Sequence, residues 1–173
     1  DFNPQFTPDY VYAGRQLPEH PIKGMQYIID ADLWNGQPDT WPAFKSEQLP
    51  FVSGFNASLK FLFISYMGLD DEAIACLKYH PEIVLVAQSI HPNRLGEYRA
   101  LAHQLMNEGL KNPLVFFQHY AEDEVENLQI KSAADMGALI IDGFCDGILL
   151  FNQSKQKGGK KISDKVTDAT AFG

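Results

Sequence analysis

Short apolar runs alternate along the chain with longer segments in which apolar residues recur every three or four positions. Such runs are typical of strands buried on both faces, and their alternation with amphipathic helices is typical of a parallel sheet. The helices are expected to begin near Asp70, Arg94 and Asp123. The strands are expected at residues 25–30, 59–66, 83–87, 114–117, 138–142 and 147–151. This pattern predicts an α/β fold with a parallel sheet and alternating helices.

The length of the chain limits how such a sheet can close. A complete (β/α)8 barrel has eight strands and needs roughly 200–250 residues. This chain has 173 residues and only the six predicted strands. The sequence therefore predicts a reduced or degenerate TIM-barrel-like domain, and both an open and a closed sheet are compatible with it.

The chain divides into three expected regions. Residues 1–24 contain four prolines and little periodicity, which predicts an extended lead-in. Residues 25–151 hold the predicted strands and helices and form the expected barrel-like domain. Residues 152–173 include a basic, glycine-containing stretch that predicts a flexible linker. Because residues 167–173 resemble the start of a helix without its body, we expect the chain to be a fragment of a longer protein.

Composition and charge exclude several classes of function. The chain has 14 Lys and Arg against 22 Asp and Glu, a net charge of −8, which argues against binding to nucleic acid or an anionic membrane. No segment has the ~20 apolar residues of a membrane-spanning helix, and no secretory leader is visible. With two cysteines and no CxxC pair, disulfides are not expected. We expect a cytoplasmic protein without nucleic-acid or membrane partners.

The cysteines and histidines do not predict a metal or cofactor site in this chain. Cys76 and Cys145 are too few for a thiolate site. No histidine is spaced from another histidine or a carboxylate as in a helical metal site. Cys145 has no basic neighbour in sequence that would lower its thiol pKa, so we expect an inert thiol rather than a nucleophile. The histidines considered are His20, His80, His91, His103 and His119.

Polar residues follow several predicted strands, where ligands bind in parallel α/β folds. His119 as a base, with Asp30 and Asp142 as carboxylates, forms a candidate set for acid/base catalysis. The simpler interpretation is that these side chains cap loops and helices where strands leave the core, and we prefer it for any single position. The positions are Asp30, Asp32, Ser65, Gln88, Ser89, Gln118, His119, Asp142 and Asp146.

Two further groups of residues have alternative interpretations. The aromatic residues between Trp34 and Phe55 form either a docking patch or a satellite core under a long loop. Four lysines between Lys155 and Lys161 form either an anion site or part of a solvated linker. The aromatic group consists of Trp34, Trp41, Phe44, Phe51 and Phe55.

The most distinctive segment runs from Ser132 to Leu150. It is expected to contain a helix end, a strand, a DGxxDG turn at residues 142–147 and a second strand. The glycines permit left-handed backbone conformations, and the aspartates can accept hydrogen bonds from backbone amides across the turn. The predicted structural residues are Gly137, Asp142, Gly143, Asp146 and Gly147.

This segment resembles a signature of 4-hydroxy-3-methylbut-2-enyl diphosphate synthase, an iron–sulfur enzyme of the methylerythritol phosphate pathway to isoprenoids. It is most similar to a second copy of that signature, in the barrel-like insert domain of the long, three-domain form. A strand similar to residues 114–119 precedes the helix there too. The resemblance is clearest over residues 112–151 and weaker over residues 59–111.

The resemblance implies that this domain is not itself catalytic. In the family's substrate barrel, an arginine and a serine after the corresponding turn hold the substrate diphosphate. Leu149 and Phe151 stand at those positions here, and an apolar side chain cannot hold an anion. The family's cluster ligands, three cysteines and a glutamate, would follow Gly173. The resemblance thus implies a 4Fe-4S cluster in the parent enzyme and no cofactor in this chain.

The expected role is that of an insert that positions the cluster domain over the substrate barrel of the same chain. The parent would reductively convert 2-C-methyl-D-erythritol 2,4-cyclodiphosphate to hydroxymethylbutenyl diphosphate, with ferredoxin or flavodoxin as electron donor. One alternative is an interaction module that binds the donor through the aromatic region at residues 34–55. Another is a free-standing small barrel enzyme that uses His119, Asp30 and Asp142.

Overall fold

The strands of the sheet pair in the order in which they occur along the chain. The computed structural model describes residues 8–153, and within them seven strands form one sheet in which every pair is parallel. The strands are β1 (Tyr10–Gly14), β2 (Gln26–Asp30), β3 (Thr40–Lys45), β4 (Lys60–Ile64), β5 (Ile83–Ala87), β6 (Leu114–Tyr120) and β7 (Gly147–Asn152). The helices are α1 (Asp71–Tyr79), α2 (Arg94–Asn107) and α3 (Val125–Ile141), with the short 3-10 segments η1 (Ala31–Leu33), η2 (Ser46–Gly54) and η3 (Tyr66–Gly68).

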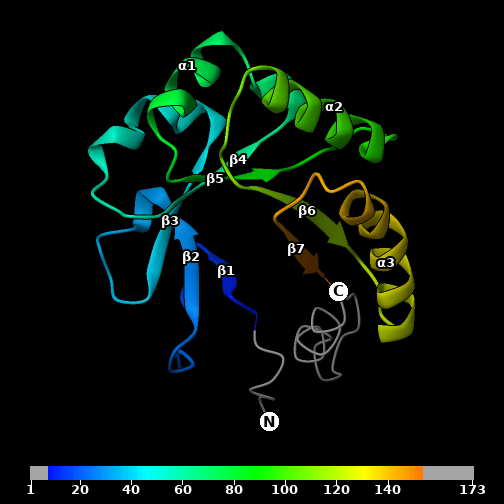
Figure 1. Cartoon of the computed structure of the whole chain (residues 1–173). Helices are drawn as coiled ribbons and strands as arrows, with labels where there is room; N and C mark the ends of the chain where they lie inside the picture. Colours follow the sequence, from blue (N-terminus) through cyan, green and yellow to red (C-terminus); the bar gives the residue numbers. More distant parts are fainter. Residues whose placement is uncertain (1–7, 154–173) are drawn as a thin grey trace.

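The sheet curls into an open half-barrel with the helices on its outer side (Figure 1). Each strand pairs in parallel with the next strand along the chain, and the twist of the strands curves the sheet. Among the described residues β1 pairs with β2 alone and β7 with β6 alone, so the barrel does not close. The predicted fold class, a reduced TIM-barrel-like parallel α/β domain, is confirmed.

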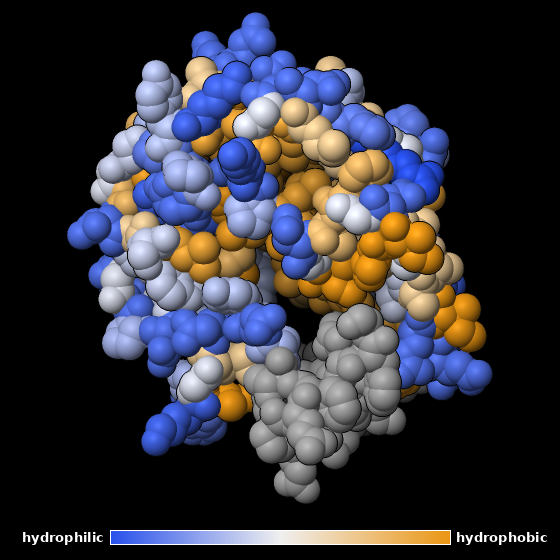
Figure 2. All heavy atoms as spheres, in the orientation of Figure 1, coloured by the Kyte–Doolittle hydropathy of each residue, from blue (hydrophilic) through white to orange (hydrophobic). Residues whose placement is uncertain are grey.

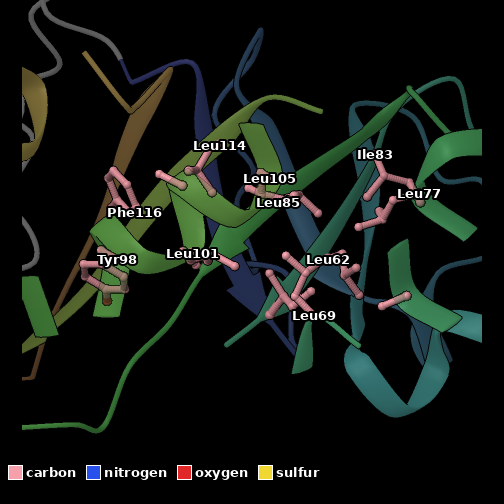
Figure 3. Packing of buried hydrophobic residues seen from close by; sticks show 14 of the residues in the cluster. Leu62, Leu69, Leu77, Ile83, Leu85, Tyr98, Leu101, Leu105, Leu114 and Phe116 are labelled. Carbon is pink, nitrogen blue, oxygen red and sulfur yellow. The ribbon is translucent and has the colours of Figure 1, made fainter. Parts of the chain in front are cut away.

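Alternation along each strand divides the apolar residues between two faces. In β4, Leu62 and Ile64 belong to the outer core that includes helix residues, whereas Phe61 and Phe63 belong to a cluster of strand residues on the concave face. Figure 3 shows side chains of the outer core, among them Leu77, Tyr98 and Leu101 from the helices and Leu85 and Phe116 from the strands. Burial of this outer core fixes the helices on the sheet.

The sequence prediction missed two strands. β1 lies inside the expected lead-in at residues 1–24 and pairs with β2. β3 lies inside a segment that was expected to be a loop. No strand is predicted there because Pro42 lacks the N–H that most strand residues contribute to a sheet. Five of the predicted strands match β2, β4, β5, β6 and β7.

The predicted strand at residues 138–142 is wrong. α3 continues to Ile141, and Asp142 caps it. The apolar run is helical because Ser132, Met136 and Leu139 fall on one buried face at helical spacing. Gly137, expected at the helix end, therefore lies within α3.

The aromatic residues near Trp34 and Phe55 mostly form a satellite of the outer core. Phe44 is buried and meets Phe55 edge-on at a centroid distance of 4.8 Å. The Trp34 ring lies 6.0 Å from the Phe55 ring, centroid to centroid. Trp41 packs on the concave face instead, and Phe51 is 68% exposed.

The turn between α3 and β7 forms hydrogen bonds with the amino end of β6. Gly143 adopts φ +71°, a conformation that favours glycine, and its N–H donates to Ile140 at 3.0 Å. Asp146 Oδ2 accepts from the Leu114 N–H at 2.8 Å, and the Asp146 N–H donates to the Leu114 carbonyl at 2.8 Å. Asp142 Oδ2 accepts from Arg99 Nε at 2.7 Å. The carboxylate of Asp146 thus helps to fix the β6–β7 register.

Across residues 8–153, no helix combines the length and apolarity needed to cross a membrane.

Replacing Asp146 with Ala should destabilise the domain more than replacing Asp142 with Ala. Asp146→Ala leaves the Leu114 N–H without its partner, which costs about 1–3 kcal/mol. Asp142→Ala removes a solvent-exposed ion pair with Arg99, which contributes little to stability. Urea unfolding of both variants measures the two losses. Equal losses would contradict the role assigned to Asp146.

Candidate functional site

The carboxyl ends of the strands surround a cavity of about 470 Å³ on the concave face. This is the edge at which parallel α/β folds bind ligands. Figure 2 shows hydrophobic residues in the hollow of the visible face and hydrophilic residues around it. The cavity is lined by apolar Ala43, Phe63 and Phe117 and by polar side chains that include Tyr12, Arg15, Asp30, Asp32, Lys45 and Gln88.

The parallel register places these side chains on one face. Asp30, the last residue of β2, pairs with Ala43 of β3, and Lys45 of β3 pairs with Phe63 of β4. In β1 the register shifts between Tyr12 and Gly14, and Gly14 adopts φ +62°. A glycine tolerates this left-handed conformation, and a bulge there redirects the chain. Arg15, the next residue, reaches the end of β2.

Two acidic side chains that line the cavity, Asp30 and Asp32, are bound by Tyr12 and Arg15. Tyr12 Oη donates to Asp30 Oδ1 at 2.7 Å. Arg15 Nη1 lies 3.0 Å from Asp32 Oδ2 and 3.7 Å from Asp30 Oδ2. Burial of the phenol and its hydrogen bond to Asp30 raise the pKa of Tyr12 well above its usual range. The carboxylates of Asp30 and Asp32 therefore interact mainly with Tyr12 and Arg15.

The cavity has the volume and the polar lining to fit a small polar ligand. Its walls carry both acceptors and donors, and Lys45 forms no ion pair within residues 8–153. Over the same described residues, no group of three or more His, Cys, Asp or Glu side chains is arranged to hold a metal ion.

The structure does not bring the candidate set of His119, Asp30 and Asp142 together. Asp30 lines the cavity. His119 is exposed at the end of β6 and lies 5.3 Å from the Phe151 ring, centroid to centroid. Asp142 caps α3 at the opposite edge of the sheet, because the segment before it is a helix and not a strand. The acid/base hypothesis for this set is therefore not supported.

The other predicted polar positions are distributed over both edges. Asp32 and Gln88 line the cavity. Gln118 is buried in the sheet, and the Ser89 hydroxyl donates to Glu97 of α2. Ser65 precedes η3, and Asp146 lies in the turn before β7.

Sequence reasoning missed Tyr12, Arg15 and Lys45. All three depend on β1 and β3, the two strands that the sequence did not predict. The alternation of aromatic residues at Tyr10 and Tyr12, followed by Gly14, is the signal that would have indicated β1.

Cys145 and Leu149 have surroundings that fit a structural role. Burial, and to a lesser degree the charge of Asp146, raise the pKa of the Cys145 thiol, although a backbone hydrogen bond at Gly147 opposes them. Leu149 packs against the concave apolar cluster, and Phe151 is 44% exposed beside His119. Neither Leu149 nor Phe151 offers a donor to an anion.

The domain is thus a parallel α/β half-barrel that carries a polar cavity at the carboxyl edge of its sheet. Comparison with curated proteins gives the chain more specific relatives. It is 65% identical over 173 residues to a protein of Bacteroides thetaiotaomicron named 4-hydroxy-3-methylbut-2-en-1-yl diphosphate synthase (flavodoxin), a match that covers 100% of this chain and 27% of the relative. The resemblance found in the sequence is thereby confirmed.

Proteins of the same name from two other organisms match as well. The identity is 54% over 172 residues for Phocaeicola vulgatus, covering 99% of this chain and 27% of the relative. It is 34% over 153 residues for Parabacteroides distasonis, covering 88% and 25%. The chain thus spans about a quarter of the length of the curated relatives it matches. No protein-family model and no solved structure matches it.

Replacing Tyr12 with Phe should reduce the loss of stability at alkaline pH. Folding favours the neutral phenol, so its contribution is complete below the ordinary tyrosine pKa of about 10 and is lost as pH rises toward the higher pKa of the folded state. Urea unfolding at about pH 9 and about pH 11 measures this loss. Tyr79→Phe is the control, because Tyr79 is 84% exposed. An equal alkaline loss in wild type and Tyr12→Phe would contradict the assignment.

Proposed function

We propose that the chain is a non-catalytic domain inside a longer 4-hydroxy-3-methylbut-2-enyl diphosphate synthase, where it positions the cluster domain over the substrate barrel. The observation that carries the proposal is the match over the whole chain to proteins of that name, of which it spans about a quarter. On this basis the parent enzyme reductively converts the methylerythritol cyclodiphosphate to hydroxymethylbutenyl diphosphate. The name of these relatives, which includes flavodoxin, supports flavodoxin as the electron donor of the parent enzyme.

The thiols of this chain do not fit an iron–sulfur cluster. Such a cluster needs a set of thiolate ligands, whereas Cys76 lies in α1 and Cys145 in the turn before β7. Burial raises the pKa of both thiols and so disfavours the thiolate form that iron binds. The 4Fe-4S cluster of the parent is therefore assigned to another part of the longer protein.

The substrate diphosphate is also assigned to another part of the longer protein. At the positions that correspond to the family's anion ligands, Leu149 faces the concave apolar cluster and Phe151 lies beside His119. An unpaired diphosphate against these side chains would lose its hydration without gaining a hydrogen bond. The half-barrel keeps a barrel-like frame, and at these two positions it offers apolar side chains in place of anion ligands.

A rigid spacer is the role that the frame supports best. The outer core joins all three described helices to the sheet. Residues 8–153 therefore pack as one firm unit, as a spacer between two other domains requires. We propose that the domain includes β1 and so begins by Tyr10 instead of residue 25, because β1 pairs with β2. The linker at residues 152–173 lies almost entirely outside the described residues and stays a prediction, as does a cytoplasmic location.

The two alternative functions receive no comparable support. The free-standing enzyme would need His119, Asp30 and Asp142 together, and Asp142 lies at the other edge of the sheet. The donor-binding module would need an exposed aromatic patch, whereas Phe44 is buried and meets Phe55 edge-on.

Exchanging residues 8–153 in the full-length protein for a glycine–serine linker should abolish or sharply lower turnover while the cluster still assembles. Without the spacer, the cluster domain no longer meets the substrate barrel at a fixed distance. Turnover is measured with a small-molecule reductant, and cluster content by iron analysis. As the control, the same residues are exchanged for the matching segment of the 54% identical relative, which should retain turnover. Unchanged turnover with the flexible linker would refute the spacer role.

A further inference from the structure

A second polar cluster lies at the amino ends of the strands, away from the cavity. Ser53 belongs to η2, whereas His80 and Glu82 lie in the loop between α1 and β5. Ser53 Oγ is 2.9 Å from His80 Nε2, and His80 Nδ1 is 3.0 Å from Glu82 Oε1. A hydroxyl, an imidazole and a carboxylate are thus joined in a chain of two hydrogen bonds.

The loop that carries His80 and Glu82 is held from two sides. Lys60, 5% exposed at the start of β4, donates to Glu82 Oε1 at 2.9 Å. Buried Asn112 donates to the carbonyls of His80 at 2.9 Å and Ile83 at 3.0 Å. Side chains fixed in this way are preorganised, which a catalytic constellation requires.

The charge of Glu82 sets the direction of both hydrogen bonds. Partial burial would raise the pKa of Glu82, but hydrogen bonds from Lys60, the backbone and His80 outweigh it and lower the pKa to about 2. The carboxylate can only accept, so Nδ1 of His80 carries the proton and donates to it. In the neutral imidazole, Nε2 then presents its lone pair and can accept the hydrogen bond from the Ser53 hydroxyl. This is the order of nucleophile, base and orienting carboxylate in serine hydrolases.

We propose that Ser53, His80 and Glu82 form an acyl-transfer site that reacts with carboxylic esters. Ser53 is exposed, so a reagent can reach its hydroxyl. Ser53 Oγ attacks the ester carbonyl carbon, and its proton passes to His80 Nε2. The proton then passes to the leaving alcohol as the ester C–O bond breaks. Water attacks the acyl-serine by the same route, giving the carboxylic acid and free Ser53. Glu82 is a positioning residue. The site is independent of the proposed spacer function.

The test is covalent labelling of the full-length protein with a fluorophosphonate, located by mass spectrometry, together with hydrolysis of p-nitrophenyl acetate. Ser53 should be labelled at least about tenfold faster than Ser58, an exposed serine in the same segment. Ser53→Ala should abolish the ester hydrolysis, and Ser58→Ala should leave it unchanged. Labelling of Ser53 no faster than of Ser58 would overturn the proposal.

Variants at the other two positions separate catalysis from structure. His80→Asn should stop the labelling of Ser53 in a protein whose circular dichroism is unchanged. Glu82→Gln should slow it at least about tenfold, and Glu82→Asp should restore part of the rate. If either exchange at Glu82 unfolds the domain, the Ser53→Ala and His80→Asn results decide the question. Full labelling in folded His80→Asn would contradict the assignment of His80 as the base.

Discussion

Parallel pairing of every strand with its chain neighbour is the constraint on which the rest of the structure depends. Each connection must cross back over the sheet, so α1, α2 and α3 all lie on the outer side, and one apolar core forms there. The same rule brings the carboxyl ends of the strands to one edge, where the polar cavity lies, and the amino ends to the other. The concave face is left with a smaller cluster made of strand residues.

The contacts in the turn before β7 that fix the β6–β7 register and the polar side chains that line the cavity lie at opposite edges of the sheet. The turn before β7 joins β6 and β7 through Asp146 and Leu114 at the amino edge, where it affects register and stability. At the carboxyl edge, Asp30 and Asp32 are held by Tyr12 and Arg15. The proposed spacer role rests on the outer core, which packs α1, α2 and α3 firmly against the sheet.

Sequence patterns predicted the parts of the fold in which burial and chain direction agree. Fully buried β4 and β5 and amphipathic α2 were recognised because their apolar periodicity is unambiguous. Residues 138–142 were misread because four apolar residues in a row suit a strand or a helix, and only the burial of Met136 and Leu139 on one side of α3 decides between them. Only part of the cavity lining could be predicted. Asp30 ends a strand that the sequence predicts, whereas Arg15 follows a bulge that local sequence does not reveal.

The redox chemistry is proposed to lie outside these residues, and visible absorption tests this most directly. The full-length protein and the 173-residue chain are purified without oxygen, and their spectra and iron contents are compared. We expect an iron–sulfur absorption band in the full-length protein and none in the chain. A cluster bound by the chain alone, or a full-length protein without colour and without iron, would contradict it.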